Sequence, residues 1–394
     1  MQVTHPVVRV STRGADRIRS GHPWVYRSDV RDANAEPGDL VQVESERGRP
    51  LGLAFWSGAS QISLRFLGVG PVDDERAFLL GRLRAAVAYR DSLAIDATAF
   101  RAVNAEADRL PGLIVDVYGA PPDRVVVVQT LTQAMDRRLS MLGDLLVEVL
   151  SPTGVLARND PRVRRLEGLP EQVVVVRGEV PETVDVREGP LTLTVNLREG
   201  QKTGLFLDQR ENHAAAAGYA RGRALDAFAY HGGFGLRLAP HCDSVLALDS
   251  SEPAIRQIRA DAARNGLANV EAREVNVFDE LREREIARDR FETIVLDPPA
   301  FARNKASVDR AAAGYKEINL RALKLLAPGG ILVTCSCSYN IDESMFEAIL
   351  ESAAADAQAT VVVVERRTQA RDHPVLLAVP ETHYLKCFVL RKLP

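Results

Sequence analysis

The sequence predicts an α/β protein that ends in a mostly parallel β-sheet covered by helices on both faces. Two observations lead to this prediction. From about residue 218, short apolar runs alternate with amphipathic segments, which is the pattern of strands and helices in such a sheet. Before that point, apolar and polar residues alternate over short runs, as in antiparallel strands. With 394 residues, the chain is long enough for two or three domains.

The composition narrows the class of protein. Hydrophobic residues make up 46% and charged residues 26% of the chain, which excludes a disordered or fibrous protein. No apolar run has the length of a membrane span, and the start of the chain lacks an apolar signal segment, so we expect a cytoplasmic protein with no membrane partner. The net charge is −3, and 44 of the 50 basic residues are arginine. Arginine suits phosphate and base edges, but genomic base composition would produce the same excess.

The four cysteines are not expected to form disulfides or to bind metal. A reducing compartment disfavours disulfides between Cys242, Cys335, Cys337 and Cys387. Cys335 and Cys337 are spaced C-x-C, without the second pair that a zinc site needs. We therefore predict no metal ligands.

The first predicted domain, residues 1–72, is a small antiparallel barrel or sandwich. Its alternating runs are VVRVS, LVQVESE, LGLAFW and ISLRFLG, with turn signals between them. Basic and aromatic residues gather near its start: Arg9, Arg13, Arg17, Arg19, Trp24 and Tyr26. Phosphate contacts next to stacking rings are typical of RNA-binding proteins. A solvated strand face beside two core aromatics would give the same sequence pattern.

The second predicted domain, residues 73–196, is a compact α+β unit. Helical spacing of apolar residues alternates here with strand-sized runs. The expected order is helix, strand, strand, helix, strand, strand, over residues 73–93, 113–117, 125–131, 133–150, 173–176 and 191–195.

The third predicted domain, residues 197–394, contains the parallel sheet. Its apolar strands are expected over residues 224–228, 245–248, 270–275, 293–296 and 331–335, with helices over 251–265 and 312–326. Ligands of such sheets bind beyond the carboxyl ends of the strands. Functional residues are therefore expected directly after these runs.

Polar or small residues follow four successive strands: Asp226 with Gly232-Gly233, Asp249, Asn276 and Asp297. The carboxylate of Asp249 is placed to bridge two ribose hydroxyls, and the side-chain oxygen of Asn276 to accept from an adenine amino group. A single strand-end Asp is more often a helix cap. Four polar strand ends in succession favour an adenosine-containing cofactor, while the missing G-x-G-x-x-G fingerprint argues against a dinucleotide.

The order Asp-x-Phe…Gly-Gly, Asp, Asn and Asp-Pro-Pro resembles class I S-adenosylmethionine-dependent methyltransferases. Further motifs are HPWVY at 22–26, SQI at 60–62, NAE at 104–106, RND at 158–160, GQKTGLFLDQR at 200–210, GYKEIN at 314–319, CSCS at 335–338 and DHPV at 372–375. With these, nearly the whole chain resembles the bacterial large-subunit rRNA cytosine-C5 methyltransferase family. That family joins a PUA domain, a central α+β domain of EEHEE type and a methyltransferase domain.

The resemblance implies a PUA β-barrel, a Rossmann-like class I methyltransferase domain and S-adenosylmethionine as cofactor. It also implies 23S rRNA, naked or as an assembly intermediate, as substrate, and it suggests a homodimer. The implied cofactor-binding residues are Phe206, Asp208, Arg210, Asp226, Phe228, Tyr230, Gly232, Gly233, Asp249, Ser250, Asn276 and Asp297. The expected RNA-binding residues are Arg9, Arg13, Arg17, Trp24 and Lys202.

Cytosine C5 is a poor nucleophile, and enzymes activate it by adding a thiolate to C6. Cys337 matches the family nucleophile by its distance from Gly329-Gly330, whereas Cys335 is expected to be a buried strand residue. Asp297 is expected to hold the cytosine edge, and Arg210 the cofactor carboxylate. No Cys follows Asp297-Pro298-Pro299, so the base that removes the C5 proton is not assigned.

Two other functions stay open. Asp-Pro-Pro followed by an aromatic residue resembles enzymes that methylate exocyclic amines of adenine or guanine, although Phe301 lies one residue too far along. The other is a non-catalytic RNA-binding or ribosome-assembly protein. The sequence also departs from the family pattern at Tyr230, near a usual loop glycine, at Asn276, where an acidic residue is frequent, and at Ala300, where Lys is expected.

Overall fold

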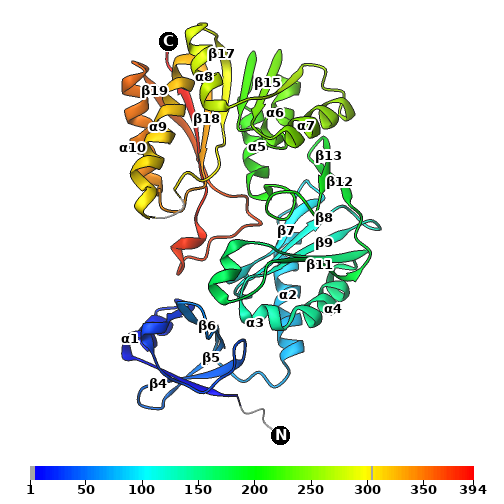
Figure 1. Ribbon diagram of the computed structural model, residues 1–394, viewed down its shortest axis with the longest axis vertical. Coiled ribbons are helices and arrows are strands. Elements are labelled where there is room, and N and C mark those ends of the chain that lie inside the picture. The colour runs from blue at the N-terminus through cyan, green and yellow to red at the C-terminus, as the bar shows by residue number, and fades with distance from the viewer. Residues whose placement is uncertain (1–4, 303–304) are drawn as a thin grey trace. The chain divides into compact units, whose positions relative to one another are not determined.

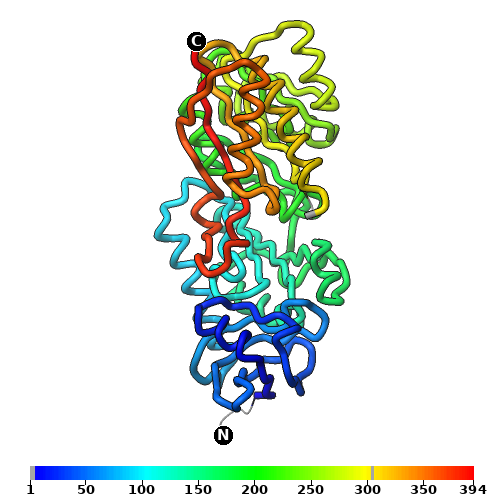
Figure 2. The backbone as a smooth tube through the Cα atoms, turned by 90° about the vertical axis from the view of Figure 1, so that its left-hand side faces the viewer, coloured from blue at the N-terminus to red at the C-terminus, as the bar shows by residue number. Residues whose placement is uncertain are grey.

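The computed structural model describes residues 5–302 and 305–394 (Figure 1). The chain forms two compact units, which are described separately. Unit 1 contains the chain up to Arg187 together with Val195–Leu205 and Asp372–Thr382. Unit 2 contains Glu188–Thr194, Phe206–Arg371 and His383–Pro394. The chain therefore passes between the units several times, a path that can be followed by colour in Figure 2.

The N-terminal part of unit 1 is a six-stranded sheet with the order β2-β6-β5-β4-β1-β3. Its strands are β1 (Val7–Val10), β2 (Trp24–Tyr26), β3 (Val30–Ala33), β4 (Leu40–Ser45), β5 (Pro50–Trp56) and β6 (Ile62–Gly68). The alternating runs thus form strands as predicted. Some of their buried residues, including Val8, Val10, Val41 and Val43, form one core, and others, including Leu53 and Phe55, pack into a second core. The purely antiparallel arrangement was a wrong prediction, because β1 and β4 pair in parallel.

The sequence analysis missed helix α1 (Thr12–Arg19) between the first two strands. Ser11 caps this helix by accepting a hydrogen bond from the Gly14 N–H. Arg13, Arg17 and Arg19 therefore lie on a helix and not on a strand face. The helix is short and strongly polar, which is why its apolar side was not recognised among the alternating strands.

The second part of unit 1 is a five-stranded sheet with the order β11-β10-β9-β8-β7. Its strands are β7 (Ala99–Asn104), β8 (Leu113–Tyr118), β9 (Val125–Thr130), β10 (Gly154–Asn159) and β11 (Gln172–Gly178), and its helices are α2 (Glu75–Ser92), α3 (Gln133–Arg137) and α4 (Leu139–Leu150). The helix predicted over 133–150 is broken at Arg138. The strand predicted at 191–195 is β13 (Leu191–Asn196), which pairs with β12 (Thr183–Glu188) in a separate two-stranded sheet.

Strands β7 and β10 were not predicted because polar residues interrupt their apolar pattern. Arg101 in β7 forms an ion pair with Asp116, with an Nε–Oδ1 distance of 2.8 Å. In β10, Arg158 donates to the carbonyl oxygens of Leu197 and Gly200, and Asn159 Oδ1 accepts from the Thr130 N–H. Asp116, Arg158 and Asn159 are buried and Arg101 is half-buried, and each has a partner, which makes these positions compatible with a sheet interior.

Unit 2 is built on a seven-stranded sheet with the order β16-β15-β14-β17-β18-β20-β19. The strands are β14 (Arg223–Ala227), β15 (Ser244–Asp249), β16 (Val270–Glu274), β17 (Phe291–Leu296), β18 (Leu326–Ser336), β19 (Val361–Arg367) and β20 (Lys386–Lys392). Strands β14 to β18 run parallel to one another. Strand β20 is antiparallel to both of its neighbours, β18 and β19. The predicted parallel α/β sheet is therefore confirmed.

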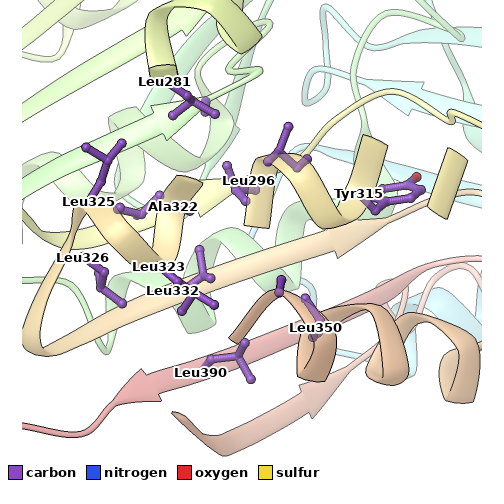
Figure 3. Close-up of a cluster of buried hydrophobic side chains, with 14 of the residues drawn as sticks. Leu281, Leu296, Tyr315, Ala322, Leu323, Leu325, Leu326, Leu332, Leu350 and Leu390 are labelled. Atoms are coloured by element: carbon purple, nitrogen blue, oxygen red, sulfur yellow. The ribbon is translucent and has the colours of Figure 1, made fainter. Parts of the chain in front are cut away.

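Helices cover both faces of this sheet. They are α5 (Arg210–Ala217), α6 (Gly233–Leu238), α7 (Glu252–Arg264), α8 (Val277–Ile286), α9 (Val308–Leu325) and α10 (Glu343–Asp356). Helices α8, α9 and α10 contribute to one core, and Figure 3 shows Ala322 and Leu323 of α9 beside Leu332 of β18 and Leu390 of β20. Neighbouring strand residues point to the opposite core beneath α5 and α6, as the period of two requires.

A buried ion pair joins the barrel to the five-stranded part of unit 1. Arg65 in β6 donates to Glu167 over 2.7 Å, and both side chains are almost fully buried. The second carboxylate oxygen of Glu167 accepts from the Ser57 hydroxyl at 2.8 Å. Glu167 therefore satisfies two polar groups of the barrel at once.

We predict that Glu167→Ala lowers the free energy of unfolding by about 3 kcal/mol, because removing one partner leaves the guanidinium of Arg65 buried without its counter-ion. The thermal unfolding midpoint measures this loss. The control is Glu148→Ala, whose carboxylate pairs with Arg76 and Arg84 at the surface and is expected to contribute less than about 1 kcal/mol. Equal losses in the two variants would contradict the importance of burial here.

Candidate active site

The candidate site lies in unit 2, where the carboxyl ends of adjacent parallel strands meet. Asp226 lies in β14, Asp249 ends β15, Asp297 directly follows β17, and Cys337 directly follows β18. These four strands are neighbours in the order β15-β14-β17-β18. Topology thus places their ends side by side, as expected from the sequence.

The loop after β14 requires its glycines. Gly232 has φ +75°, a conformation that L side chains rarely adopt. A Cβ atom on Gly233 would lie 2.4 Å from the His213 ring. Phe228 and Tyr230 also have positive φ, at 66° and 46°. The backbone here is therefore fixed in a tight turn that leads into α6.

Asp226 holds this loop and keeps one oxygen available. Its Oδ2 accepts from the Gly235 N–H at 2.7 Å, while its buried Oδ1 has no hydrogen-bond partner in the described part of the chain. Burial, supported by the nearby Asp297 carboxylate, raises the pKa of Asp226 to about 7. A buried acceptor without a donor fits a ligand that brings an N–H or O–H group, as the amino acid and ribose parts of S-adenosylmethionine do.

Asp249 is oriented by the backbone on both sides. Its Oδ2 accepts from the Tyr230 N–H and its Oδ1 from the Ser251 N–H, both at 2.9 Å. Each carboxylate oxygen keeps a second lone pair for a ribose hydroxyl. Ser250 is exposed beside it, and Tyr230 packs edge-on against Phe206 with ring centroids 5.3 Å apart.

In the described part of the chain, the Asn276 side-chain oxygen contacts the start of the next helix, and its expected adenine contact stays a prediction. Asn276 is the N-cap of α8, and its Oδ1 accepts from the N–H groups of Phe278 and Asp279 at 3.0 and 3.5 Å. Both lone pairs are thus used by the helix, as N-cap residues commonly use them. An adenine amino group would therefore share this oxygen with the backbone of α8.

The residues before β14 are buried and ordered by neighbours within unit 2. Asp208 Oδ2 accepts from the Tyr384 hydroxyl at 2.7 Å, and its backbone oxygen accepts from the Ala370 N–H. Arg210 begins α5 and is also buried. Because both side chains are buried, they are not ordinary solvated surface charges.

Asp297 is held by a chain of amide groups that the sequence analysis missed. Gln209 donates to Asp297 Oδ1 at 2.8 Å, and Gln209 Oε1 accepts from Asn212 at 2.6 Å. Asn212 Oδ1 in turn accepts from Arg367 at 2.9 Å. Because each amide is fixed by the next donor, the carboxylate has one defined orientation. Gln209 lies within the GQKTGLFLDQR motif, which was the available signal.

A second missed group is the pair of His213 and Glu188 beneath the glycine loop. His213 Nδ1 lies 2.8 Å from Glu188 Oε1, and its ring packs edge-on against Phe234. Burial alone would lower the pKa of His213, but Glu188 together with Asp297 and Asp226 raises it above its ordinary value. The imidazole therefore supports the loop and offsets the negative charge around Asp226.

The structure distinguishes the two cysteines near the end of β18. Cys335 is fully buried opposite Cys387 of β20, and burial raises the pKa of its thiol well above the ordinary value. Cys337 lies beyond the strand and is partly exposed, and its Sγ is 3.9 Å from the carbonyl oxygen of Pro298. Cys337 is thus next to the Asp-Pro-Pro turn, whereas Cys335 belongs to the core beneath α5 and α6.

The expected RNA-binding residues lie in unit 1, and most have partners there. Arg9 pairs with Glu44, Arg13 pairs with the buried Asp29, and Arg17 stacks on the Tyr26 ring at 4.8 Å. The Trp24 indole N–H donates to Glu106 at 3.1 Å. Lys202 is exposed in the segment before Leu205. Phosphate contacts by Arg9 and Arg13 would therefore compete with existing ion pairs.

The described residues were also compared with the requirements of a membrane-spanning helix and of a metal site. None of their helices is both long and apolar enough to cross a membrane. No group of three or more His, Cys, Asp or Glu side chains within these residues is arranged to hold a metal ion.

The comparisons with known proteins agree with this geometry. A family model described as a PUA-like domain matches residues 8–68, and one described as an S-adenosylmethionine-dependent methyltransferase matches residues 169–391. The fold also resembles a solved Streptococcus mutans protein described as a SAM-dependent methyltransferase, with a TM-score of 0.82, 19% identity and coverage of 98% of this chain and 99% of that one. A second similar structure, with a TM-score of 0.84, 20% identity and the same coverage, is described as a methyltransferase and is complexed with SAH.

Fold and site together define a Rossmann-like S-adenosylmethionine-dependent methyltransferase with an N-terminal PUA-like domain. The ribosomal RNA large subunit methyltransferase I of Aeromonas hydrophila is 38% identical over 384 residues, which cover 94% of this chain and 95% of that protein. The protein of the same name from Tolumonas auensis is 37% identical over 383 residues, with the same coverage. The chain belongs to the family of these ribosomal RNA large subunit methyltransferase I proteins.

We predict that Asp226→Asn weakens S-adenosylmethionine binding at least about tenfold, because a buried acceptor for the cofactor loses its charge. Titration calorimetry measures this change. The unliganded variant should also gain stability relative to the wild type as the pH rises from about 4 to 7. Since the folded-state pKa is raised to about 7, the wild type loses stability over that window and levels off above it.

The control for this pair of measurements is Asp243→Asn, an exposed carboxylate before β15. It should leave both the affinity and the pH dependence of the unfolding midpoint unchanged. Unchanged cofactor affinity in Asp226→Asn would contradict the assignment of Asp226 to the cofactor site.

Proposed function

We propose that this protein methylates C5 of a cytosine in 23S rRNA, with Cys337 as the nucleophile that adds to C6. The substrate class follows from the relatives, which are named as large-subunit rRNA methyltransferases, and from the PUA-like domain. The single observation that carries the proposal is the position of Cys337. It is partly exposed at the carboxyl end of β18, beside the Asp-Pro-Pro turn and next to the strand ends that form the cofactor site.

The cofactor supplies an electrophilic methyl group when it is bound. The residues proposed to hold it are Asp226 and Asp249, with the ring of Phe206 and the backbone of the Gly232-Gly233 loop beside them. Asp208 and Arg210 are proposed to hold its amino acid part. Asp226 has one oxygen without a donor, and each oxygen of Asp249 keeps a second lone pair, so both can accept from donors on this cofactor.

The chain's own residues are assigned the following steps. The thiolate of Cys337 forms the Sγ–C6 bond, and the electron pair of the C5–C6 double bond moves to C5, which becomes nucleophilic. Asp297, oriented by Gln209, holds the N3 and N4 edge of the ring. After methyl transfer, the C5 proton leaves to a water molecule, and the returning electron pair re-forms the double bond and expels the thiolate.

Several further expectations belong to this proposal. They are the domain boundaries 1–72, 73–196 and 197–394, the RNA contacts of Arg9, Arg13, Arg17, Trp24 and Lys202, the homodimer and the cytoplasmic location. No comparison tests them, and they stay predictions. Whether the substrate is naked rRNA or an assembly intermediate is part of the same set.

We predict that Cys337→Ala abolishes methylation of unmodified 23S rRNA, whereas Cys335→Ala keeps most of the activity. The reason is that only Cys337 reaches the partly exposed strand-end site, while Cys335 is enclosed in the core. Nucleoside mass spectrometry with labelled S-adenosylmethionine is the measurement, and labelled 5-methylcytidine is the expected product.

Two outcomes of this experiment would overturn the proposal. Loss of activity in Cys335→Ala but not in Cys337→Ala would reassign the nucleophile. Methylated adenosine or guanosine, formed equally well by Cys337→Ala, would place the protein among the enzymes that methylate exocyclic amines.

A further inference from the structure

Lys386, at the start of β20, is a buried ammonium group next to the segment that carries Cys337. Its relative exposure is 4%, and its Nζ donates to the carbonyl oxygens of Ser338 at 2.8 Å and Tyr384 at 2.9 Å. Through the strand pairing, Lys386 also lies opposite Ser336. The lysine is therefore fixed to the chain on both sides of Cys337.

The charged neighbours of Lys386 come from two elements. Cys337 interacts with it electrostatically, and Asp342 and Glu343 face it from the beginning of α10. Burial lowers the pKa of Lys386 to about 8, with those groups opposing the shift, so the ammonium is mainly charged at pH 7. Tyr315 also faces Cys337, but burial raises the pKa of its phenol to about 12, and it is neutral at pH 7.

Two carbonyl oxygens use two of the three N–H donors of the ammonium. The third has no hydrogen-bond partner in the part of the chain that the structure describes. A buried cation without a full set of partners is unfavourable unless an anion is near it. A thiolate at Cys337 would supply that anion. The thiolate would stabilise the ammonium of Lys386, and the ammonium would equally stabilise the thiolate.

We propose that Lys386 is a positioning residue that favours the thiolate form of Cys337 and so prepares it for attack on the base. The inference rests on the proposed function, in which Cys337 is the nucleophile. In the step concerned, the thiol proton leaves to solvent water, sulfur keeps the electron pair, and Lys386 keeps its three protons. A thiolate next to a lysine ammonium is stabilised relative to the thiol, which is the reactive form that nucleophilic catalysis needs.

Lys386 also has a structural role through its two carbonyl contacts, and the test must separate that role from its charge. Lys386→Gln keeps a hydrogen-bond donor but removes the charge, whereas Lys386→Arg keeps the charge. Lys392→Gln is the matched control. Lys392 lies at the other end of β20, and its Nζ also donates to two carbonyl oxygens, those of Leu323 and Leu326 at 2.8 and 2.9 Å.

The experiment measures the rate at which iodoacetamide alkylates Cys337 in the full chain between pH 5.5 and 9.5, with the modified residue located by peptide mass spectrometry. It needs no RNA and no cofactor. We expect Lys386→Gln to move the midpoint of the pH–rate profile up by about one pH unit and to lower the rate at pH 7 about tenfold. Lys386→Arg should stay near the wild type, and Lys392→Gln should change the rate less than about twofold.

An unchanged pH profile in Lys386→Gln, with a cooperative thermal unfolding transition, would overturn the inference. If Lys386→Gln does not fold, the wild type is compared with Lys386→Arg. An unchanged pH–rate profile in Lys386→Arg supports a role for the positive charge, and a shifted profile contradicts it. The alkylation result is independent of the product analysis. A shifted profile together with methylated adenosine or guanosine would refute the proposed function and leave the effect of Lys386 on Cys337 standing.

Discussion

The pairing of β20 with β18 is the interaction on which the proposed chemistry depends. Because β20 lies antiparallel between β18 and β19, the start of β20 meets the carboxyl end of β18. This register sets Cys387 opposite Cys335 and Lys386 opposite Ser336. It brings a C-terminal segment to a site that the preceding strands form in parallel.

The same C-terminal segment also contacts the cofactor side of the site. Tyr384, two residues before β20 reaches full pairing, donates to Asp208, while Lys386 donates to the backbone next to Cys337. One short stretch of chain is therefore bound both to the proposed cofactor residues and to the proposed nucleophile. Through these two contacts, β20 and the residues before it contribute to the candidate site.

Negative charge is the second constraint on the site. Asp226, Asp297 and Asp249 lie close enough to influence one another, and burial makes an ionised Asp226 unfavourable in the unliganded protein. His213, paired with Glu188, and the backbone N–H of Gly235 oppose this effect. Asp226 Oδ1 has no donor in the described part of the chain, which fits a ligand that brings an N–H or O–H group.

The sequence predicted the parallel sheet well because its strands are continuous apolar runs, each followed by a polar residue. Asp226, Asp249 and Asp297 were singled out for that reason, whereas Cys337 was named from its resemblance to the family nucleophile. Strands β7 and β10 were not predicted because polar residues interrupt their apolar pattern. The partners of these polar residues, such as Asp116 for Arg101 and Thr130 for Asn159, lie on other strands. The Gln209–Asp297 contact and Lys386 could not be predicted in the same way, since only the fold brings residues 88 and about 50 positions apart together.

The central claim is the covalent adduct between Cys337 and cytosine C6. The most direct measurement is the mass of a complex between the protein and 23S rRNA carrying 5-fluorocytidine, in the presence of S-adenosylmethionine. Fluorine at C5 cannot leave as a proton does, so the adduct should persist, and peptide analysis should locate the nucleotide on Cys337. Methyl transfer to unsubstituted rRNA without any trapped adduct on the fluorinated RNA would contradict the thiolate mechanism.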